Sequence, residues 1–402
     1  MVRDLSNGEK ETMSDSKLQF SNREALFYHS AGRPGKIEIV ASKPMATQRD
    51  LSLAYSPGVA VPVKAIAEDP ATAYDYTAKG NLVAVISNGT AILGLGNLGA
   101  LASKPVMEGK AALFKRFANI DAWPVCLDTQ DVDEIVRTVQ IIAPVYGGIN
   151  LEDISAPRCF EIEARLRDLL DIPVFHDDQH GTAIVVLAAL TNALKLVKKD
   201  LANTKIVLSG VGAAGTAVAR LLIANGAKNI IGFGKDGLIF ADKGESDPMR
   251  KWFVENCSPG SFRGDLSAAM KDADIFIGVS APNVLTESDV KSMAKGGIVF
   301  ALANPDPEID PVIARRHAAV VATGRSDQPN QINNVLAFPG IFRGLLDGHI
   351  TKITDKMLVL AAEAIASCVS DEQLNANFIV PSVFDLNVVQ KVAAAVKKSS
   401  KE

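Results

Sequence analysis

The sequence predicts an α/β protein with two domains, a doubly wound parallel sheet in the C-terminal part and a smaller α/β domain before it. Two observations support this prediction. First, short apolar strand patterns alternate with helix patterns from about residue 160 onward, which is the order of a parallel sheet covered by helices on both faces. Second, a glycine-rich loop at residues 210–215 lies between a predicted strand and a predicted helix.

The elements of the N-terminal part follow from the spacing of apolar residues. Residues 81–86 and 121–127 are largely apolar runs, as in strands that are buried on both faces. Residues 131–142 carry apolar side chains at helical spacing. In chain order, the predicted elements are a helix at 21–35, strands at 37–40 and 81–86, a helix at 106–118, a strand at 121–127, and helices at 131–142 and 156–170.

The C-terminal part shows a more regular alternation. Its first helix, 181–197, is long and apolar and has no Gly or Pro in its interior. The helix at 213–225 is followed by Gly226, a residue that favours helix termination. The predicted order is a strand at 172–175, a helix at 181–197, a strand at 205–209, a helix at 213–225, and strands at 229–233, 274–278, 297–302 and 319–322.

Composition argues against several classes of protein. The formal net charge of −4 argues against nucleic-acid binding, which needs a basic surface. The longest apolar stretch, 183–190, is too short to span a bilayer, so we expect no membrane association. The four cysteines lack metal-ligand spacing and are typical of reduced thiols in a cytoplasmic protein. Residues 1–20 mix both charges without an apolar run, so we expect a disordered segment rather than a targeting signal.

The loop at 210–215 has the glycine spacing of a dinucleotide-binding domain of the Rossmann type. Its glycines would allow a tight turn, close approach of the backbone to a pyrophosphate, and close packing of the helix on the strand. The alternative is an ordinary strand-turn-helix connection. We favour a nicotinamide dinucleotide site built from Gly210, Val211, Gly212, Ala213, Ala214 and Gly215. We therefore place the dinucleotide-binding domain, with a helical C-terminal segment, at 161–402 and the smaller domain at 21–160.

The end of the second strand of such a domain distinguishes NAD from NADP. An NAD site usually carries an acidic residue there, hydrogen-bonded to the ribose 2′-hydroxyl. Here the strand ends at Phe233 and Gly234, and Lys235 follows at once. A cation in place of a carboxylate favours a 2′-phosphate, so we predict NADP with Lys235 as a contact. The alternative is that Asp236 takes the acidic role and the cofactor is NAD.

Two pairs of adjacent acidic residues stand about 25 residues apart at the ends of predicted elements: Glu152 with Asp153, and Asp177 with Asp178. Adjacent carboxylates repel each other unless a cation lies between them, and hard oxygen ligands suit Mg²⁺ or Mn²⁺. Taken singly, each pair has a structural alternative, because acids at a helix N-terminus complement the helix dipole. Together they favour a metal site. A divalent metal beside a nicotinamide cofactor indicates oxidation of a hydroxy acid, with the metal holding the developing carbonyl.

Two single residues are candidates for proton transfer. Lys110 lies in a helical, mostly apolar stretch, where its amine either snorkels to solvent or, beside a metal, has a lowered pKa and acts as a base. Tyr55 lies in a turn before Pro57. It is either an aromatic side chain that packs a loop against the core or a general acid.

Four further polar residues lie near predicted element ends. Asn304 follows the strand 297–302, at the position where open α/β sheets bind ligands, although Asn before Pro is also common in turns. Asn334 stands in a similar polar segment. His176 and His180 flank the second acid pair, and we interpret them as polar neighbours rather than metal ligands.

Taken in order, these residues resemble the malic enzyme family in its compact prokaryotic-type form. The resemblance covers about residues 35–390. It rests on motifs that begin, in family order, at Tyr55, Gly94, Glu108, Glu152, Asp177, Asn304 and Asn333. The longer eukaryotic forms carry an arginine just before the Gly94 motif. This chain has Thr90 and Ala91 there, so binding of the malate carboxylate by that arginine is not carried over.

The resemblance implies oxidative decarboxylation of L-malate to pyruvate and CO₂ with reduction of NADP⁺, or alternatively NAD⁺, and also decarboxylation of oxaloacetate. It implies Mg²⁺ or Mn²⁺ and a homodimer with its active site near the subunit interface. By position, the metal ligands would be Glu152, Asp153 and Asp178, and Asp177 would support them. Lys110 would be the base and Tyr55 the acid. Malate would contact Lys110, Asn304 and Asn334, and Asn304 would also contact the cofactor.

Two other functions stay open at this point. A metal-dependent hydroxy-acid dehydrogenase without decarboxylation would release oxaloacetate instead of pyruvate and CO₂. A non-catalytic, nucleotide-sensing Rossmann protein would need neither the acid pairs nor Lys110.

Overall fold

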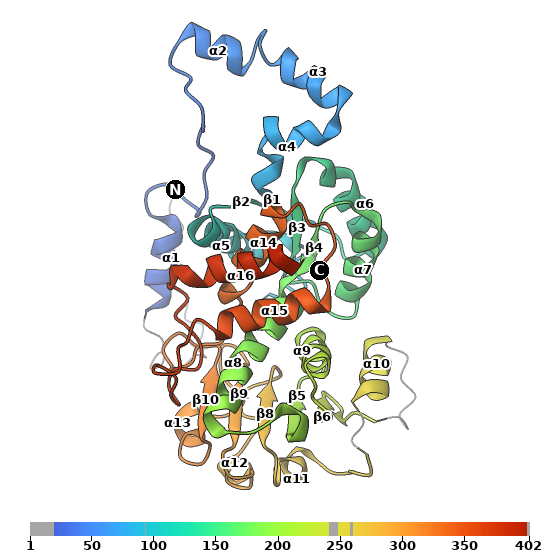
Figure 1. Ribbon diagram of the computed structural model, residues 1–402, viewed down its shortest axis with the longest axis vertical. Coiled ribbons are helices and arrows are strands. Elements are labelled where there is room, and N and C mark those ends of the chain that lie inside the picture. Colours follow the sequence, from blue (N-terminus) through green and yellow to red (C-terminus); the bar gives the residue numbers. More distant parts are fainter. Residues whose placement is uncertain (1–19, 93, 241–247, 258–259, 400–402) are drawn as a thin grey trace, which may run out of the picture.

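A computed structural model of the chain describes residues 20–92, 94–240, 248–257 and 260–399. Two sheets follow one another along the long axis, helices lie around and between them, and an arm of short helices projects from one end (Figure 1). Residues 1–19 of the segment predicted to be disordered lie outside the described residues.

The first sheet is parallel and has the order β2-β1-β3-β4. Its strands and flanking helices are β1 (Leu82–Ser87), α5 (Ala100–Ala118), β2 (Asp121–Cys126), α6 (Val132–Ile142), β3 (Gly148–Leu151), α7 (Arg158–Leu169) and β4 (Val174–His176). Alternate residues of β1 enter different cores: Val83 and Val85 pack with α5, whereas Ala84 and Ile86 pack with α6 and α7. Burial on both faces explains the continuous apolar pattern of this strand.

The prediction of this part differs from the structure in several places, and it left out the helices Gln48–Ala54, Ala60–Glu68 and Ala73–Tyr76. The segment 37–40 forms no strand, and its residues 38–40 are exposed. The helix predicted at 106–118 begins at Ala100 and contains Pro105, a residue that in sequence suggests a helix start. Strand β3 was missed because its four residues, which include a glycine and an asparagine, give too short an apolar pattern.

The second sheet has the order β10-β9-β8-β5-β6-β7, and only β7 is antiparallel among the described strands. Its elements are α8 (Thr182–Val197), β5 (Lys205–Ser209), α9 (Ala213–Ala224), β6 (Asn229–Gly234), β7 (Gly237–Leu238), α10 (Pro248–Asn256), α11 (Leu266–Met270), β8 (Ile275–Gly278), α12 (Glu287–Lys291), β9 (Ile298–Ala301), α13 (Pro311–Ala314) and β10 (Val320–Thr323). Ile206 and Leu208 of β5 share a core with α8 and α9, while Val207 faces α11 to α13. The predicted doubly wound α/β fold is confirmed.

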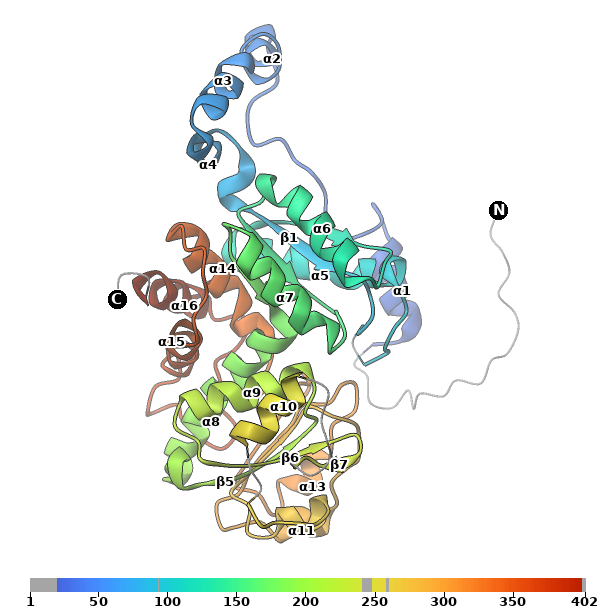
Figure 2. The ribbon, with the colours of Figure 1, turned by 90° about the vertical axis from the view of Figure 1, so that its right-hand side faces the viewer.

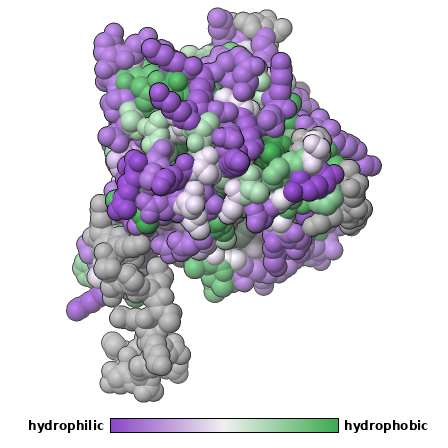
Figure 3. Space-filling model, turned by 90° about the horizontal axis from the view of Figure 1, so that it is seen from below, coloured by the Kyte–Doolittle hydropathy of each residue, from purple (hydrophilic) through white to green (hydrophobic). Residues whose placement is uncertain are grey.

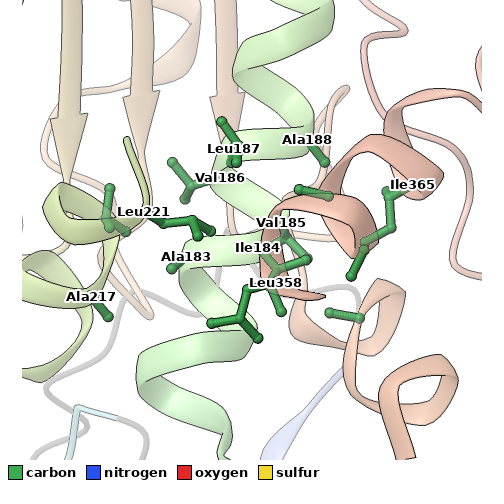
Figure 4. Packing of buried hydrophobic residues seen from close by; sticks show 14 of the residues in the cluster. Ala183, Ile184, Val185, Val186, Leu187, Ala188, Ala217, Leu221, Leu358 and Ile365 are labelled. Atoms are coloured by element: carbon green, nitrogen blue, oxygen red, sulfur yellow. The ribbon is translucent and has the colours of Figure 1, made fainter. Parts of the chain in front are cut away.

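Helix α8 is the centre of the largest core. Its side chains pack against Ala217 and Leu221 of α9 on one side and against Leu358 and Ile365 of α15 on the other (Figure 4). The helical stretch Asp177–Val197 is long and apolar enough to cross a membrane, but 67% of its most apolar window is buried inside the fold. In the described part of the chain this is therefore a core helix.

Three C-terminal helices follow the second sheet, α14 (Phe338–Asp347), α15 (Asp355–Ala366) and α16 (Leu386–Ser399); α14 and α16 contact α5 of the first domain, and α15 packs on α8. The ring of Phe114 in α5 lies 4.7 Å from that of Phe338 and 5.2 Å from that of Phe342. The C-terminal helical segment thus packs on both halves of the molecule (Figure 2). The boundary drawn after residue 160 falls inside α7, and β4 still belongs to the first sheet, so the change of sheet comes after β4.

Helix α1 (Asn22–Ser30) lies beside the body of the molecule, and the projecting arm that follows it carries α2 (Gln48–Ala54), α3 (Ala60–Glu68) and α4 (Ala73–Tyr76) (Figures 1 and 2). None of these helices has a buried residue. Helices α2 and α3 stand away from the body of the molecule in both ribbon views (Figures 1 and 2). The opposite end of the molecule is covered mainly by hydrophilic residues with small apolar patches between them (Figure 3).

Candidate active site

The two acid pairs meet because they follow neighbouring parallel strands. Leu151 of β3 pairs with His176 of β4, so the residues after each strand emerge at the same edge of the sheet. One carboxylate oxygen from each of Glu152, Asp153 and Asp178 lies within 4.8 Å of the other two. All three donors are carboxylate oxygens, a set that suits a hard divalent cation such as Mg²⁺ or Mn²⁺.

Local hydrogen bonds hold this three-carboxylate cluster. Asp153 has a left-handed backbone with φ of 53°, a conformation that aspartate adopts more readily than most residues. Its N–H donates to Asp178 Oδ2 at 2.9 Å, and Asn150 Nδ2 donates to Glu152 Oε2 at 2.9 Å. Burial raises the pKa of Glu152, Lys110 opposes this effect, and the neighbouring carboxylates raise the pKa further. A bound cation would favour the ionised form.

Lys110 of α5 points into the same cluster. Its Nζ donates to Asp177 Oδ2 at 2.6 Å and lies 2.9 Å from Glu152 Oε1, and it also stands 4.3 Å from the centre of the Phe338 ring. The side chain is 11% exposed, so the alternative that it snorkels to solvent is wrong. Burial alone would lower the pKa of Lys110, but the two carboxylates raise it above its ordinary value. The two carboxylates therefore oppose the lowered pKa that was considered for Lys110 from the sequence.

Asp177 faces Lys110 and stands outside the three-carboxylate cluster. It is fully buried, and Asn334 Nδ2 donates to its Oδ2 at 3.2 Å. A Cβ atom added at Gly181 would lie 2.0 Å from Asp177 Oδ1, so only glycine leaves room for this carboxylate. Asp177 therefore contacts Lys110 of α5, Gly181 at the start of α8 and Asn334 in the segment before α14.

The glycine loop has the shape of an anion site. Gly210 has φ of 98°, and a Cβ on Gly215 would lie 2.0 Å from the Gly210 carbonyl oxygen. In contrast, a Cβ on Gly212 would meet nothing within 4 Å. No side chain caps the N-terminus of α9, which leaves its first N–H groups available to a phosphate. The loop therefore fits the pyrophosphate of a dinucleotide.

The far end of the cofactor site lies at the end of β6. Lys235 and Asp236 form the exposed turn of a hairpin in which Gly234 pairs with Gly237. The guanidinium of Arg250 in α10 lies 3.3 Å from the place where a Cβ of Gly234 would stand, and 3.8 Å from the Asp236 carboxylate. The pattern of the sequence did not single out Arg250, because a lone cation at a helix start carries no motif.

Asn304 lies at the end of β9, as expected, and reaches the first domain there. A Cβ on Gly94 would lie 2.6 Å from its carbonyl oxygen, and a Cβ on Gly324 would lie 2.9 Å from its Nδ2. The backbone at Gly94 therefore lies against the backbone at Asn304, just after β9.

Tyr55 is the one predicted site residue that the structure places elsewhere. It ends α2 on the projecting arm and is 71% exposed. Within one chain, the two candidates for proton transfer, Lys110 and Tyr55, are therefore not brought together (Figures 1 and 2).

Comparisons with known proteins identify the family of the chain. Residues 34–167 match the malic enzyme N-terminal domain, and residues 179–401 match the malic enzyme NAD binding domain, which confirms the predicted dinucleotide-binding fold. The chain is 56% identical to an NAD-dependent malic enzyme of Geobacillus stearothermophilus, over 91% of this chain and 77% of the relative. It is 54% identical to an NADP-dependent malic enzyme of Rhizobium meliloti, over 94% of this chain and 52% of the relative.

Solved structures indicate the same family. A malic enzyme from Pyrococcus horikoshii superimposes with a TM-score of 0.89 at 46% identity, covering 94% of this chain and 90% of that one. The names of the relatives divide between NAD and NADP and so do not select the cofactor. The resemblance seen in the ordered motifs is confirmed, and the chain belongs to the malic enzyme family.

Proposed function

We propose that the chain catalyses the oxidative decarboxylation of L-malate to pyruvate and CO₂ with reduction of NADP⁺, and that it also decarboxylates oxaloacetate. The observation that carries this proposal is the junction of a buried lysine with a three-carboxylate cluster beside the start of the nucleotide-binding domain. A non-catalytic nucleotide sensor would have no need to bury this cation and these acids together.

Each residue of the site has a role in this reaction. Bound at Glu152, Asp153 and Asp178, Mg²⁺ or Mn²⁺ would stabilise charge on the C2 oxygen of malate and offset the carboxylate charge beside Lys110. Lys110 would take the proton of the C2 hydroxyl as the C2 hydride passes to a bound nicotinamide, which converts malate to oxaloacetate. The C3–C4 bond of oxaloacetate would then break, so that CO₂ leaves and the enolate of pyruvate remains. Asp177 holds the Lys110 amine in place through the 2.6 Å hydrogen bond.

Two asparagines at the domain junction are proposed contacts to malate. Asn334 is positioned by its hydrogen bond to Asp177, and Asn304 stands where the first domain meets the end of β9. Amide groups in this position can bond the carboxylates of malate and orient C2 towards the cofactor. Asn304 would also contact the cofactor.

The end of β6 supports NADP over NAD. Gly234 stands where an NAD site usually has its acid, and the cations Lys235 and Arg250 flank it. Asp236, the alternative partner of a 2′-hydroxyl, is 69% exposed in the hairpin turn and directs its carboxylate towards Arg250. Two cations around one glycine would accommodate a 2′-phosphate.

Initial rates with L-malate and Mn²⁺ test this function. We expect faster turnover with NADP⁺ than with NAD⁺ and equal yields of NADPH, pyruvate and CO₂. Accumulation of oxaloacetate without CO₂ would instead indicate a dehydrogenase that does not decarboxylate, and nucleotide binding without turnover would indicate a sensor. Lys235→Ala should lower kcat/KM for NADP⁺ and leave that for NAD⁺ nearly unchanged.

We further propose that the protein acts as a homodimer in which each arm completes the site of the other copy. The arm exposes many large apolar side chains, an arrangement that is unfavourable in water unless another surface covers them. Those on α2, α3 and the turn between them are Leu51, Leu53, Tyr55, Val59, Val61 and Val63. Tyr55 of one copy would then protonate C3 of the enolpyruvate that forms in the other copy.

Mixing two inactive variants tests the exchange of arms. In a mixed dimer of Lys110→Ala and Tyr55→Phe chains, one site combines the intact Lys110 of one copy with the intact Tyr55 of the other. Because a two-fold symmetric dimer has two equivalent sites, random mixing should restore roughly a quarter of the wild-type activity. No recovery after dissociation and mixing would contradict the proposal.

A cytoplasmic location is also proposed, because none of the four cysteines forms a disulfide.

A further inference from the structure

The turn between β4 and α8 carries both acids that this part of the chain contributes to the site. Asp178 adds an oxygen to the three-carboxylate cluster, and Asp177 accepts the hydrogen bond from Lys110. The turn is a single π-helical one, Asp177–Gly181, and no side chain caps its start. Such turns are rare and recur at functional sites, where contacts from other elements hold them.

Glu163 of α7 makes such contacts. Its carboxylate accepts hydrogen bonds from the backbone N–H of His176 at 3.2 Å, from Nε2 of His180 at 2.7 Å and from Nε2 of Gln179 at 3.3 Å. His176 precedes the two acids of the turn, and the other two donors follow them. One carboxylate is therefore bonded to the chain on both sides of the acid pair.

The surroundings of Glu163 keep this carboxylate fixed and ionised. Its side chain is only 7% exposed, and Arg167, one helical turn further on, lies 4.0 Å away. Burial alone would raise the pKa of Glu163, but His180, which donates a hydrogen bond to this carboxylate, and Arg167 lower it. The ring of Phe175 packs against that of His180 at 5.5 Å, which restricts the orientation of the imidazole.

We propose that Glu163 is a positioning residue of the metal site, which fixes the π-helical turn so that its two acids meet their partners from β3 and α5. This inference rests on the metal ligands assigned under the proposed function. The competing explanation is that Glu163 only stabilises the packing of α7 on β4. A purely structural role would lower the melting temperature without a selective loss of cation affinity.

Binding of Mn²⁺ to the metal-free protein, followed by the electron paramagnetic resonance signal of free Mn²⁺, separates these explanations without turnover. Glu163→Gln keeps the shape of the side chain but has one acceptor oxygen for three donors. We expect its Kd for Mn²⁺ to rise about 10- to 100-fold, as for other groups that orient metal ligands. At saturating Mn²⁺ and malate, kcat should fall much less.

Glu161→Gln is the matched control. Glu161 lies on the same helix, but its carboxylate is 58% exposed and pairs with Arg165 at 3.1 Å. Its loss should leave the Kd for Mn²⁺ unchanged. A second pair of variants serves if Glu163→Gln does not fold: His180→Leu removes one donor and should weaken Mn²⁺ binding, while His180→Gln keeps an N–H group and should restore it.

Asp178→Asn, measured in parallel, separates the assignment of the metal ligands from the positioning role of Glu163. Unchanged Mn²⁺ affinity in Asp178→Asn would overturn the metal-ligand assignment itself. Lost affinity in Asp178→Asn together with wild-type affinity in folded Glu163→Gln or in His180→Leu would overturn the positioning role alone. An equal loss in Glu161→Gln would also overturn it.

Discussion

The ammonium of Lys110 is the counter-ion of the acid cluster, and its removal tests the electrostatics of the whole site. Its Nζ lies 2.6 Å and 2.9 Å from the carboxylates of Asp177 and Glu152, which are both buried, and the Lys110 side chain is only 11% exposed. Lys110→Met keeps an unbranched side chain but leaves these carboxylates without their cation. Removing one partner of a buried ion pair costs about 3–5 kcal/mol, because the remaining charge stays out of water. That is a large share of the total stability of a typical domain, about 5–15 kcal/mol.

A divalent cation should reverse most of this loss. A ligand that binds only the folded state at 100 times its Kd stabilises it by about 2.7 kcal/mol. Mn²⁺ should also bind Lys110→Met more tightly than it binds the wild type, because no ammonium competes for the carboxylates. In Mn²⁺, the free energy of unfolding of Lys110→Met should therefore approach that of the wild type without Mn²⁺. The variant should nevertheless remain inactive.

The loss should also depend on pH. In the wild type, burial and the neighbouring acids already raise the pKa of Glu152 against the opposing effect of Lys110, and the variant lacks that opposition. A carboxyl group whose folded-state pKa lies above its unfolded value destabilises the fold as the pH rises from the unfolded pKa to the folded pKa. Lys110→Met should therefore be least stable, relative to wild type, at the alkaline end of the range.

Urea unfolding in EDTA and in MnCl₂, at acidic and at alkaline pH, measures all three effects. Lys115→Met is a suitable control, because Lys115 lies on the same helix with an exposed partner, Asp121, at 2.9 Å. Exposed pairs contribute about 0–1 kcal/mol, so this variant should unfold nearly as the wild type does. If Lys110→Met were as stable as Lys115→Met in EDTA, the buried ammonium would not be the counter-ion of the cluster.

Three other perturbations have definite expected outcomes. Gly181→Ala should displace Asp177, because the Cβ of the new alanine would lie 2.0 Å from Asp177 Oδ1. We expect kcat/KM for malate to fall at least about tenfold, which corresponds to roughly 1.4 kcal/mol of lost transition-state stabilisation. Gly212→Val should raise KM for the nucleotide without lowering the melting temperature, because its Cβ faces open space. Burial raises the pKa of Cys159 and Cys257 to about 12, so neither thiol should react with a disulfide reagent at pH 8 until the protein unfolds.

Each of these three predictions has a control variant or an outcome that would contradict it. Gly109→Ala places its Cβ 3.6 Å from one flexible lysine side chain, so it should leave turnover intact; a similar loss there would show that α5, and not Asp177, is the sensitive element. A lower melting temperature in Gly212→Val would show that the loop is packed rather than open. Rapid reaction of more than two thiols in the folded protein would contradict the burial of Cys159 and Cys257.

Much of the fold and the approximate place of the site could be predicted from the sequence because their signals are local. Strand β1 is apolar on both faces because it is buried on both, and this pattern appears in any window that contains it. The glycine loop is equally local, since the tight turn at Gly210 and the close contact at Gly215 require glycine whatever lies elsewhere. The two acid pairs are local signals as well, because adjacent carboxylates repel each other unless a cation lies between them, although the strand β3 that places the first pair was missed.

Other features depend on contacts between distant segments and have no local signal. Asp177 and Asp178 are neighbours in the chain, yet one faces Lys110 and the other faces Glu152 and Asp153, because the π-helical turn directs them differently. The pKa of Lys110 is raised and not lowered for the same reason: two carboxylates reach it from other elements.

The sequence by itself therefore determined the fold class and the glycine loop of the nucleotide-binding domain, and it predicted which acids form the cluster. Only the tertiary structure decided which acid faces the lysine, that Glu163 is bonded on both sides of the turn, and that Tyr55 stands on an arm away from its expected partner. The physical reason is that backbone preferences and apolar periodicity act over a few residues, whereas burial and electrostatic pairing join segments that lie 13 to 187 residues apart in this chain.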